Sequence, residues 1–368
     1  MSNPILDKAL KSLKKINPDA EFLNNNTLSN ITGYVNTGSY ALNAIISGNI
    51  KTGGIPIGRI TGLSGPSGCG KTLMVNKIFA NAQKQYGMIP VMWDTEAAVD
   101  LKSAANVGCN VDEYIWNPID KIEECRNQMV QFLDNIIANP EMKGKFILGL
   151  DSLGNLVASK ELQDIEKNKD AADMGLRARA MKSLMRTLTL KAAKAQTPII
   201  FTNHIYDDPS ALFPSLIKNQ GGGKGPVYLA SVLVQMSMTQ NKEDDVAGDK
   251  IAIANKVNGI TMSAMTVKNR IIPPFLKTEL LLNFKTGLDE YSGLDTMVKA
   301  YDVVVQTGST YQLPDGTKLG YYSKWGKDKD LWENVLIPEL QKKLDKELTY
   351  SNDQNIIDED DQHDEEEA

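Results

Sequence analysis

The chain has 368 residues, 42% of them hydrophobic and 23% charged, which is the composition of a globular protein and excludes a fibrous or largely disordered one. It contains no apolar run of about 18 residues, and its N-terminus lacks the apolar stretch of a signal peptide, so we expect a cytoplasmic protein with no membrane partner. The cysteines Cys69, Cys109 and Cys125 have no C-x-x-C spacing, which argues against a disulfide framework or a zinc site.

The first 16 residues are predicted to form a basic amphipathic helix. One face is apolar and the other carries four lysines: Ile5, Leu6, Ala9, Leu10, Leu13 and Ile16 on the first, and Lys8, Lys11, Lys14 and Lys15 on the second. A polar segment, 17–39, separates this helix from the rest of the chain. The apolar face needs a surface to pack on, and both its own domain and a neighbouring protomer are candidates. We assign 1–36 to an N-terminal helix and linker for oligomerisation.

Residues 37–286 alternate between short apolar runs and helical periods. Runs at 60–63, 90–94, 146–151 and 198–204 are typical of buried parallel strands, and a helical period at 122–136 ends before Pro140. This pattern predicts an α/β fold with a mostly parallel sheet. Strand-like segments at 227–238, 251–257 and 260–267 then extend the sheet in antiparallel fashion, with Asn258-Gly259 as the expected hairpin turn.

The composition changes after Gly287, where 287–350 is expected to form a small C-terminal α/β module ending in a helix at 331–348. Residues 351–368 hold nine carboxylates and no lysine or arginine, leaving 40 basic and 37 acidic residues in the rest of a chain whose net charge is −6. This segment is predicted to be a disordered acidic tail. It either raises solubility or competes with a polyanion for the basic surface.

One motif dominates the sequence, G-x-x-x-x-G-K-[ST], between a predicted strand and a predicted helix. It predicts a phosphate-binding loop for ATP, made of Gly65, Pro66, Ser67, Gly68, Cys69, Gly70, Lys71 and Thr72. The glycines allow backbone N–H groups to converge on phosphate oxygens at a helix N-terminus. Lys71 would reach the β- and γ-phosphates, and the Thr72 hydroxyl would bind Mg²⁺.

Two further strand ends carry carboxylates. Asp151 ends an apolar strand and is the candidate for holding Mg²⁺, directly or through water. Glu96 follows the strand that ends at Asp94, and the carboxyl ends of parallel strands share one edge with the phosphate loop, so Glu96 is the candidate general base and Asp94 the alternative. His204 ends another strand before a long segment, 205–225, and is a candidate sensor of the γ-phosphate.

The segment 174–206 has no carboxylate but is rich in basic residues, among them Arg177, Arg179, Lys182 and Arg186. On a helix, the last three share one face while Leu176, Ala180, Leu184 and Leu188 share another. One face can therefore pack and the other can contact a phosphate backbone. A merely solvated charged face is the alternative interpretation.

Several motifs in order resemble those of RecA-type recombinases: TGSYALNAIISGNIKTGGIPIGRITGLSGPSGCGKT (37–72), DTEAAVD (94–100), LDSLGNL (150–156), DMGLRARAMKSLMR (173–186) and VKNRIIPPF (267–275). The stretches LDSLGNLVASKE and FTNHIY, with the glycine triplet before KGP, are most similar to the UvsX-type recombinases of tailed phages. The resemblance runs from about residue 37 to 348.

This resemblance implies an ATP-dependent recombinase that forms a helical filament on single-stranded DNA and exchanges strands with homologous duplex DNA. It implies ATP and Mg²⁺ as cofactors, a DNA-dependent ATPase activity, mediator and single-strand-binding proteins as further partners, and, for a phage protein, a bacterial host cytoplasm. Residues 160–172 match the first DNA-binding loop and 206–223 the second, so Gly221, Gly222, Gly223 and Lys224 join the expected DNA site. Lys268 and Arg270 match a basic pair that reaches the γ-phosphate of the neighbouring protomer.

A hexameric replicative helicase motor is the alternative function. It uses a similar core, but it lacks the 173–186 helix and normally carries a larger N-terminal domain than the residues before the core allow.

Overall fold

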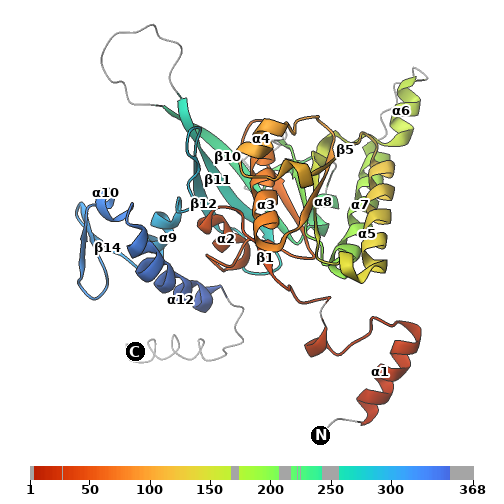
Figure 1. The fold of residues 1–368 in the computed structure, drawn as a ribbon, viewed down its shortest axis with the longest axis horizontal. Helices are drawn as coiled ribbons and strands as arrows, with labels where there is room; N and C mark the ends of the chain where they lie inside the picture. The colour runs from red at the N-terminus through yellow and green to blue at the C-terminus, as the bar shows by residue number, and fades with distance from the viewer. Residues whose placement is uncertain are drawn as a thin grey trace, which may run out of the picture.

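The computed structural model describes residues 4–26, 28–166, 174–206, 217–221, 223, 225–242 and 257–348. Figure 1 shows a central sheet with helices on both sides, a helix near the N-terminus that stands away from the body, and a small C-terminal module beside one edge of the sheet. No helix among the described residues combines the length and the apolar character needed to cross a membrane.

The central sheet has nine strands in the order β13-β12-β11-β10-β3-β7-β6-β4-β5. Six of them run parallel: β10 (Val232–Lys242), β3 (Ile60–Ser64), β7 (Ile199–Asn203), β6 (Phe146–Asp151), β4 (Ile89–Asp94) and β5 (Ile115–Pro118). Three antiparallel strands extend one side: β11 (Val257–Asn269), β12 (Lys277–Asn283) and β13 (Gly287–Leu288). The predicted α/β fold, a mostly parallel sheet with an antiparallel extension, is confirmed.

Apolar residues of the strands alternate between two buried clusters, one on each face of the sheet. One face packs against α2 (Tyr40–Ser47) and α3 (Lys71–Tyr86), and the other against α5 (Ile122–Ala138) and α7 (Met174–Ala195). In β6, for example, Ile147 faces the first cluster and Leu148 the second. Strands buried on both faces explain why their sequences are continuous apolar runs rather than alternating ones.

Shorter elements connect these layers. They are α4 (Leu101–Asn106), α6 (Ser159–Glu166), α8 (Gly225–Leu229), β8 (Ile205–Tyr206), β9 (Asn219–Gln220), and the 3-10 turns η2 (Val111–Glu113), η3 (Pro140–Met142) and η4 (Leu153–Asn155). The strand β5 was not predicted, because its four residues are largely exposed at the sheet edge and carry no apolar run.

The N-terminal region begins with α1 (Pro4–Ile16), as predicted, and none of its residues is buried. It continues through η1 (Leu23–Asn25) to β1 (Tyr34–Val35), which pairs with β2 (Ile55–Pro56). The linker is tied to the body because the Arg59 guanidinium donates to the carbonyls of Leu28 and Ser29.

The C-terminal module contains a three-stranded sheet and several helices, in agreement with the predicted α/β composition. Its elements are α9 (Leu294–Ala300), β14 (Val305–Thr307), β15 (Thr310–Gln312), β16 (Lys318–Gly320), α10 (Tyr322–Trp325), and the helical run α11 (Lys329–Leu331), η5 (Trp332–Leu336) and α12 (Ile337–Glu347). The module shares one buried cluster with α2, since Leu340 and Leu344 pack in the same core as Leu42 and Ile45.

Two local predictions were wrong. Residues 227–229 lie in α8, so β10 begins five residues later than expected. Asn258-Gly259 lies inside β11, where Gly259 pairs with Asn241 and Asn283. A Cβ on Gly259 would lie 2.3 Å from the carbonyl oxygen of Leu282, so this glycine permits close strand contact instead of a turn. The segments 251–256 and 351–368, including the predicted acidic tail, lie outside the described residues.

Candidate active site and nucleic-acid interface

The phosphate loop lies where predicted, between the end of β3 and the start of α3. Its tip, Pro66 to Gly68, is exposed, and Gly68 and Gly70 have φ of 76° and 88°, a region that favours glycine. A Cβ on Gly65 would lie 2.6 Å from the Met236 carbonyl oxygen, and one on Gly70 would lie 2.7 Å from Met262 Sδ. Backbone geometry and close packing thus both require glycine, and the loop forms an open cradle suited to phosphate oxygens.

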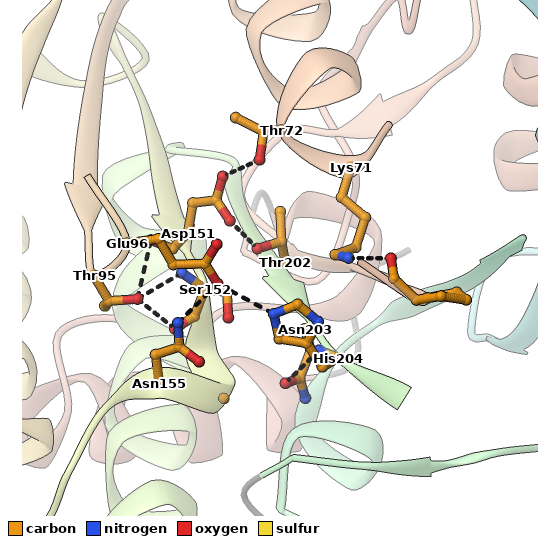
Figure 2. A network of polar contacts seen from close by, with 12 residues as sticks. Lys71, Thr72, Thr95, Glu96, Asp151, Ser152, Asn155, Thr202, Asn203 and His204 are labelled. Atoms are coloured by element: carbon orange, nitrogen blue, oxygen red, sulfur yellow. Dashed lines mark hydrogen bonds and ion pairs between the residues drawn. The ribbon is translucent and has the colours of Figure 1, made fainter. Parts of the chain in front are cut away.

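The two polar residues of the motif point into the same site (Figure 2). Lys71 Nζ donates to the carbonyl oxygens of Gly65 at 3.0 Å and Pro66 at 2.7 Å, so the ammonium lies over the loop. Thr72 Oγ1 donates to Asp151 Oδ2 at 2.5 Å. Both residues begin α3, where unpaired N–H groups and the helix dipole favour an anion.

Asp151 is buried at the end of β6, and both of its oxygens are held. Thr72 binds Oδ2, and Thr202, from the neighbouring strand β7, donates to Oδ1. Burial raises the pKa of this carboxyl, and the two hydroxyl groups oppose that rise. The next hydroxyl, Ser152 Oγ, is buried and has no hydrogen-bond partner among the described residues. The Thr72 hydroxyl and the Asp151 carboxylate, which are hydrogen-bonded to each other, form a donor pair that fits a hydrated Mg²⁺ beside phosphates.

The geometry separates Glu96 from its competitor Asp94. The Asp94 carboxylate is 2% exposed and accepts hydrogen bonds from the N–H groups of Glu96 and Val99 and from Trp116 Nε1. Its oxygens are therefore used to shape the loop after β4. The Glu96 carboxylate is partly open to solvent, with a side-chain exposure of 28%. Of the two carboxylates, that of Glu96 is therefore the one open to solvent.

Glu96 also joins two other parts of the site. Its Oε1 lies 2.8 Å from Asn155 Nδ2 and 3.1 Å from His204 Nε2. Asn155 follows β6 and precedes the segment 160–172, and His204 follows β7 and precedes the segment 206–223. One carboxylate therefore contacts the chain just ahead of both segments that resemble DNA-binding loops. A protonated His204 would form an ion pair with Glu96.

Lys268 and Arg270 do not join this site within one chain. Lys268 Nζ donates to the carbonyls of Val227 and Tyr228, and Arg270 Nη2 donates to the carbonyl of Tyr228 at 2.9 Å. Burial, and then the nearby Arg270 charge, lower the pKa of Lys268 to about 8. The Arg270 N–H donates to the Ser231 carbonyl, and the Ser231 N–H donates to the Ile60 carbonyl. Ile60 begins β3, five positions before Gly65, which is roughly 16 Å along an extended strand. The basic pair therefore lies at the end of β3 away from the phosphate loop.

The basic helix α7 packs as predicted and exposes three of its four candidate cations. Leu184 and Leu188 are buried, as are Met181 and Met185, whereas Arg179, Lys182 and Arg186 are exposed. Arg177 behaves differently: it is half-buried and donates to the carbonyls of Gly154 and Leu156, so in this structure it holds the chain after β6.

The glycine-rich segment lies against α7. A Cβ on Gly223 would lie 3.6 Å from Ala178 Cβ, and one on Gly225 would lie 3.2 Å from Lys182 Cα. Gly223 and Gly225 are thus near α7, whereas Gly221 lies against Asn203 and Gly154, and Gly222 and Lys224 lie outside the described residues. We call the surface formed by Arg179, Lys182, Arg186, Gly223 and Gly225 the α7 basic face.

Sequence reasoning missed the residues that hold the predicted ones in place. Thr95 accepts from the Ser152 N–H at 2.8 Å and donates to the Ser152 carbonyl at 3.0 Å. Thr202 and Asn203 directly precede His204, and Asn155 lies four residues after Asp151. Their only sequence signal is a polar side chain at the end of an apolar strand.

Comparisons with known proteins agree with this geometry. The family model for the RecA N-terminal domain matches residues 5–289. The RecA protein of Borrelia hermsii is 30% identical over 84% of this chain and 81% of its own length. The RecA proteins of Thermus thermophilus and Deinococcus radiodurans are each 28% identical, over 87% and 84% of this chain and 86% and 77% of their own lengths.

These matches do not favour the helicase alternative. The protein is an ATP-dependent recombinase with DNA-dependent ATPase activity and uses ATP with Mg²⁺. The chain belongs to the RecA family.

Proposed function

We propose that this recombinase binds ATP between neighbouring protomers of a filament on single-stranded DNA and there pairs that strand with homologous duplex DNA. One observation carries the proposal. The phosphate loop lies at the carboxyl edge of the parallel sheet, and Lys268 and Arg270 lie at the opposite edge of the same sheet. A site that uses both groups needs two chains in a head-to-tail arrangement, which generates an open helix when it does not close.

The proposed mechanism assigns a role to each described group. Lys71 and the loop amides bind the β- and γ-phosphates, and Thr72 and Asp151 hold Mg²⁺, which neutralises phosphate charge when bound. Glu96 accepts a proton from the attacking water, since its carboxylate is partly open to solvent whereas that of Asp94 is buried and hydrogen-bonded. Lys268 and Arg270 of the next protomer stabilise the charge that develops on the γ-phosphate. His204 senses the γ-phosphate through its contact with Glu96.

Hydrolysis then weakens the contact between protomers, because the phosphate that attracts Lys268 and Arg270 leaves. The α7 basic face of each protomer supplies backbone contacts to DNA. Loss of ATP therefore releases DNA and neighbour together, which couples the chemical state to filament assembly.

The helix α1 is proposed as a second contact between protomers. Its apolar residues are exposed: Ile5 is 77% and Ile16 81% exposed. The edge strand β5 and the nearby α4 present exposed apolar groups, with Trp116 49% and Leu101 68% exposed, beside a cavity of about 150 Å³. Acidic residues surround this patch, namely Asp100, Asp112 and Glu113, and the lysines of α1 are complementary to them. We propose that α1 of one copy covers this patch on the next.

We further propose the UvsX-type subclass of tailed phages, on the basis of the stretches at 150–161, 201–206 and 221–226. A phage recombinase acts in the cytoplasm of its bacterial host, where single-strand-binding and mediator proteins are the expected partners. The domain limits 1–36, 37–286, 287–350 and 351–368 are retained as part of this proposal.

A mixing experiment tests the shared site. The Lys71→Ala variant and a Lys268→Ala/Arg270→Ala variant should each lose DNA-dependent ATP hydrolysis. Mixed in equal amounts with single-stranded DNA, they should recover about a quarter of the wild-type rate, because a head-to-tail polymer places an intact loop beside an intact basic pair at that frequency. No recovery in filaments that electron microscopy shows to contain both variants contradicts the proposal.

A further inference from the structure

The chain ahead of the first DNA loop meets the end of the second DNA loop at Gly154 and Gly221. Gly154 lies in η4 after β6, and Gly221 follows β9. A Cβ on Gly221 would lie 3.2 Å from Gly154 Cα, and a Cβ on Gly154 would lie 4.0 Å from Gly221 Cα. Neither glycine has a positive φ, so backbone conformation does not demand glycine at either position. The glycines instead allow the two backbones to touch.

The side chain of Asn203 contacts both glycines of this crossing. Asn203 is 0% exposed at the end of β7, and its Nδ2 donates to the Gly221 carbonyl at 2.9 Å and to Gln220 Oε1 at 3.3 Å. Its Oδ1 accepts from the His204 N–H at 3.0 Å. A Cβ on Gly154 would lie 2.8 Å from this same oxygen, and one on Gly221 would lie 3.0 Å from it. The Asn203 amide therefore contacts His204, which precedes the second DNA-binding segment (206–223), and Gly221 within that segment. It also lies against Gly154, which precedes the first segment (160–172).

The crossing is connected to the nucleotide site on two sides. Gln220 Nε2 donates to Ser64 Oγ at 3.2 Å, and Ser64 is the last residue of the strand before the phosphate loop. Glu96 contacts Asn155 and His204, the neighbours of Gly154 and Asn203. On the far side, Arg177 of α7 donates to the Gly154 carbonyl. The crossing is thus connected to the neighbours of Glu96 on one side and to α7, the helix that carries the basic face, on the other.

We infer that Asn203, packed against Gly154 and Gly221, is a positioning residue that makes the two DNA loops respond together to the nucleotide. A shift of the Glu96 carboxylate would change its contacts with both Asn155 and His204. The Asn203 amide would keep Gly154 and Gly221 at a fixed distance from each other as these contacts change. Without this amide, the two loops are no longer held together at Gly154 and Gly221, so the affinity for DNA no longer depends on which nucleotide is bound. The inference rests on the proposed function, because it needs both loops to bind DNA.

The test measures the dissociation constant of the full-length protein for single-stranded DNA, once with ADP and once with a slowly hydrolysed ATP analogue. The ratio of the two constants is the coupling between the sites, and ratios of about 5 to 150 are typical of coupled sites. We expect Asn203→Ala and Gly154→Ala to lower the wild-type ratio at least about fivefold, toward one. Affinity for the ATP analogue without DNA should stay within about twofold of wild type, because neither side chain lines the phosphate loop.

Two further variants make the result specific. In the double variant Gly154→Ala/Asn203→Ala, the added methyl group no longer meets the Asn203 oxygen, so the loss should be no larger than in Asn203→Ala alone. The control is Asn43→Ala: Asn43 is equally buried and also bonds to backbone groups outside its own helix, at Thr37 and Ile50, but it lies on α2. It should lower the thermal midpoint as Asn203→Ala does and keep the wild-type ratio.

Each outcome has a separate meaning. Wild-type ratios in both single variants overturn the inference while leaving the proposed function intact. An equal loss in Asn43→Ala, or additive losses in the double variant, also overturn it, because the effect then comes from general destabilisation or from independent sites. A wild-type ratio near one overturns the proposed function itself, and this inference with it.

Discussion

Thr72 Oγ1 donates a 2.5 Å hydrogen bond to Asp151 Oδ2, although the two residues lie on α3 and β6 and are 79 positions apart. The bond fixes the direction of the hydroxyl hydrogen, so the oxygen lone pairs of Thr72 face away from Asp151. Thr72 and Asp151 would then be the residues that hold Mg²⁺, which would supply positive charge beside the phosphates. Because Thr202 holds the other carboxylate oxygen, Asp151 keeps one orientation before any ligand arrives.

The first prediction concerns Asp151→Asn. Burial raises the pKa of the Asp151 carboxyl above its ordinary value of 3.8, so the folded protein binds this proton more tightly than the unfolded chain does. Ionisation therefore destabilises the fold, with no cost below about pH 4 and the full cost above the raised pKa. At neutral pH without nucleotide, Asp151→Asn should unfold at a higher temperature than wild type, and this difference should vanish in acid.

The same substitution removes the charge that we propose holds Mg²⁺, so ATP hydrolysis should fall at least about 100-fold. Thermal denaturation at a series of pH values and a steady-state ATPase assay are the measurements. Thr202→Val is the companion variant: it keeps the charge, loses one supporting hydroxyl, and should need more Mg²⁺ for half-maximal rate. A lower thermal midpoint for Asp151→Asn at neutral pH contradicts the account.

The second prediction concerns Lys71→Ala. Its ammonium lies over the phosphate loop, 2.7 Å from the Pro66 carbonyl oxygen, where a bound phosphate offers a stronger partner. Removing it should lower DNA-dependent ATP hydrolysis by about 100-fold or more and abolish strand exchange. Lys77→Ala is the matched control, because Lys77 lies on the same helix with its stem against Gly38. Retained strand exchange in Lys71→Ala would place the nucleotide elsewhere.

Strands with long apolar runs and the phosphate loop were predictable from the sequence, because burial on both faces and phosphate binding each leave a strong local pattern. Asn258-Gly259 was misread for a physical reason: the dipeptide favours a turn, but here the glycine relieves contact with the Leu282 carbonyl. The roles of Thr202, Asn203 and Asn155 could not be foreseen, since each depends on which strands become neighbours. The sequence also could not distinguish Arg177, which is half-buried and bonds to the chain after β6, from Arg179, which is exposed on a different face of the same helix and bonds only within α7 among the hydrogen bonds of the described residues.

The third prediction concerns pH. Burial, and next the charge of Arg270, lower the pKa of Lys268 to about 8. In a free protomer the charged form of Lys268 lowers the stability of the fold, and the full loss of stability is present below about pH 8. The loss disappears as the pH rises from there toward the pKa of lysine in the unfolded chain, about 10.4. A neighbour's γ-phosphate favours the charged form and should raise this pKa. ATP-dependent assembly near pH 8.5 should therefore take up protons.

Proton uptake can be measured with a pH indicator in weakly buffered solution as filaments form. Lys268→Arg is the control, because a guanidinium stays charged across this range and should show no uptake from this site. Filaments that assemble with equal proton release or uptake in both proteins would show that Lys268 does not meet the phosphate.

The fourth prediction concerns the α7 basic face. Arg179 and Arg186 are exposed, and contact with DNA phosphates would release counterions from the single strand. The slope of log affinity against log salt concentration should become shallower by about 1.4 in Arg179→Ala/Arg186→Ala, at about 0.7 for each lost contact. The same helix supplies the control pair, since Lys191 and Lys194 already form ion pairs with Asp134 and Asp19. Lys191→Ala/Lys194→Ala removes the same formal charge from the same helix and should leave the slope unchanged. Equal slopes in both double variants and in wild type would move the DNA path off α7, whereas equal changes in both would mean that net charge, and not the exposed face, governs binding.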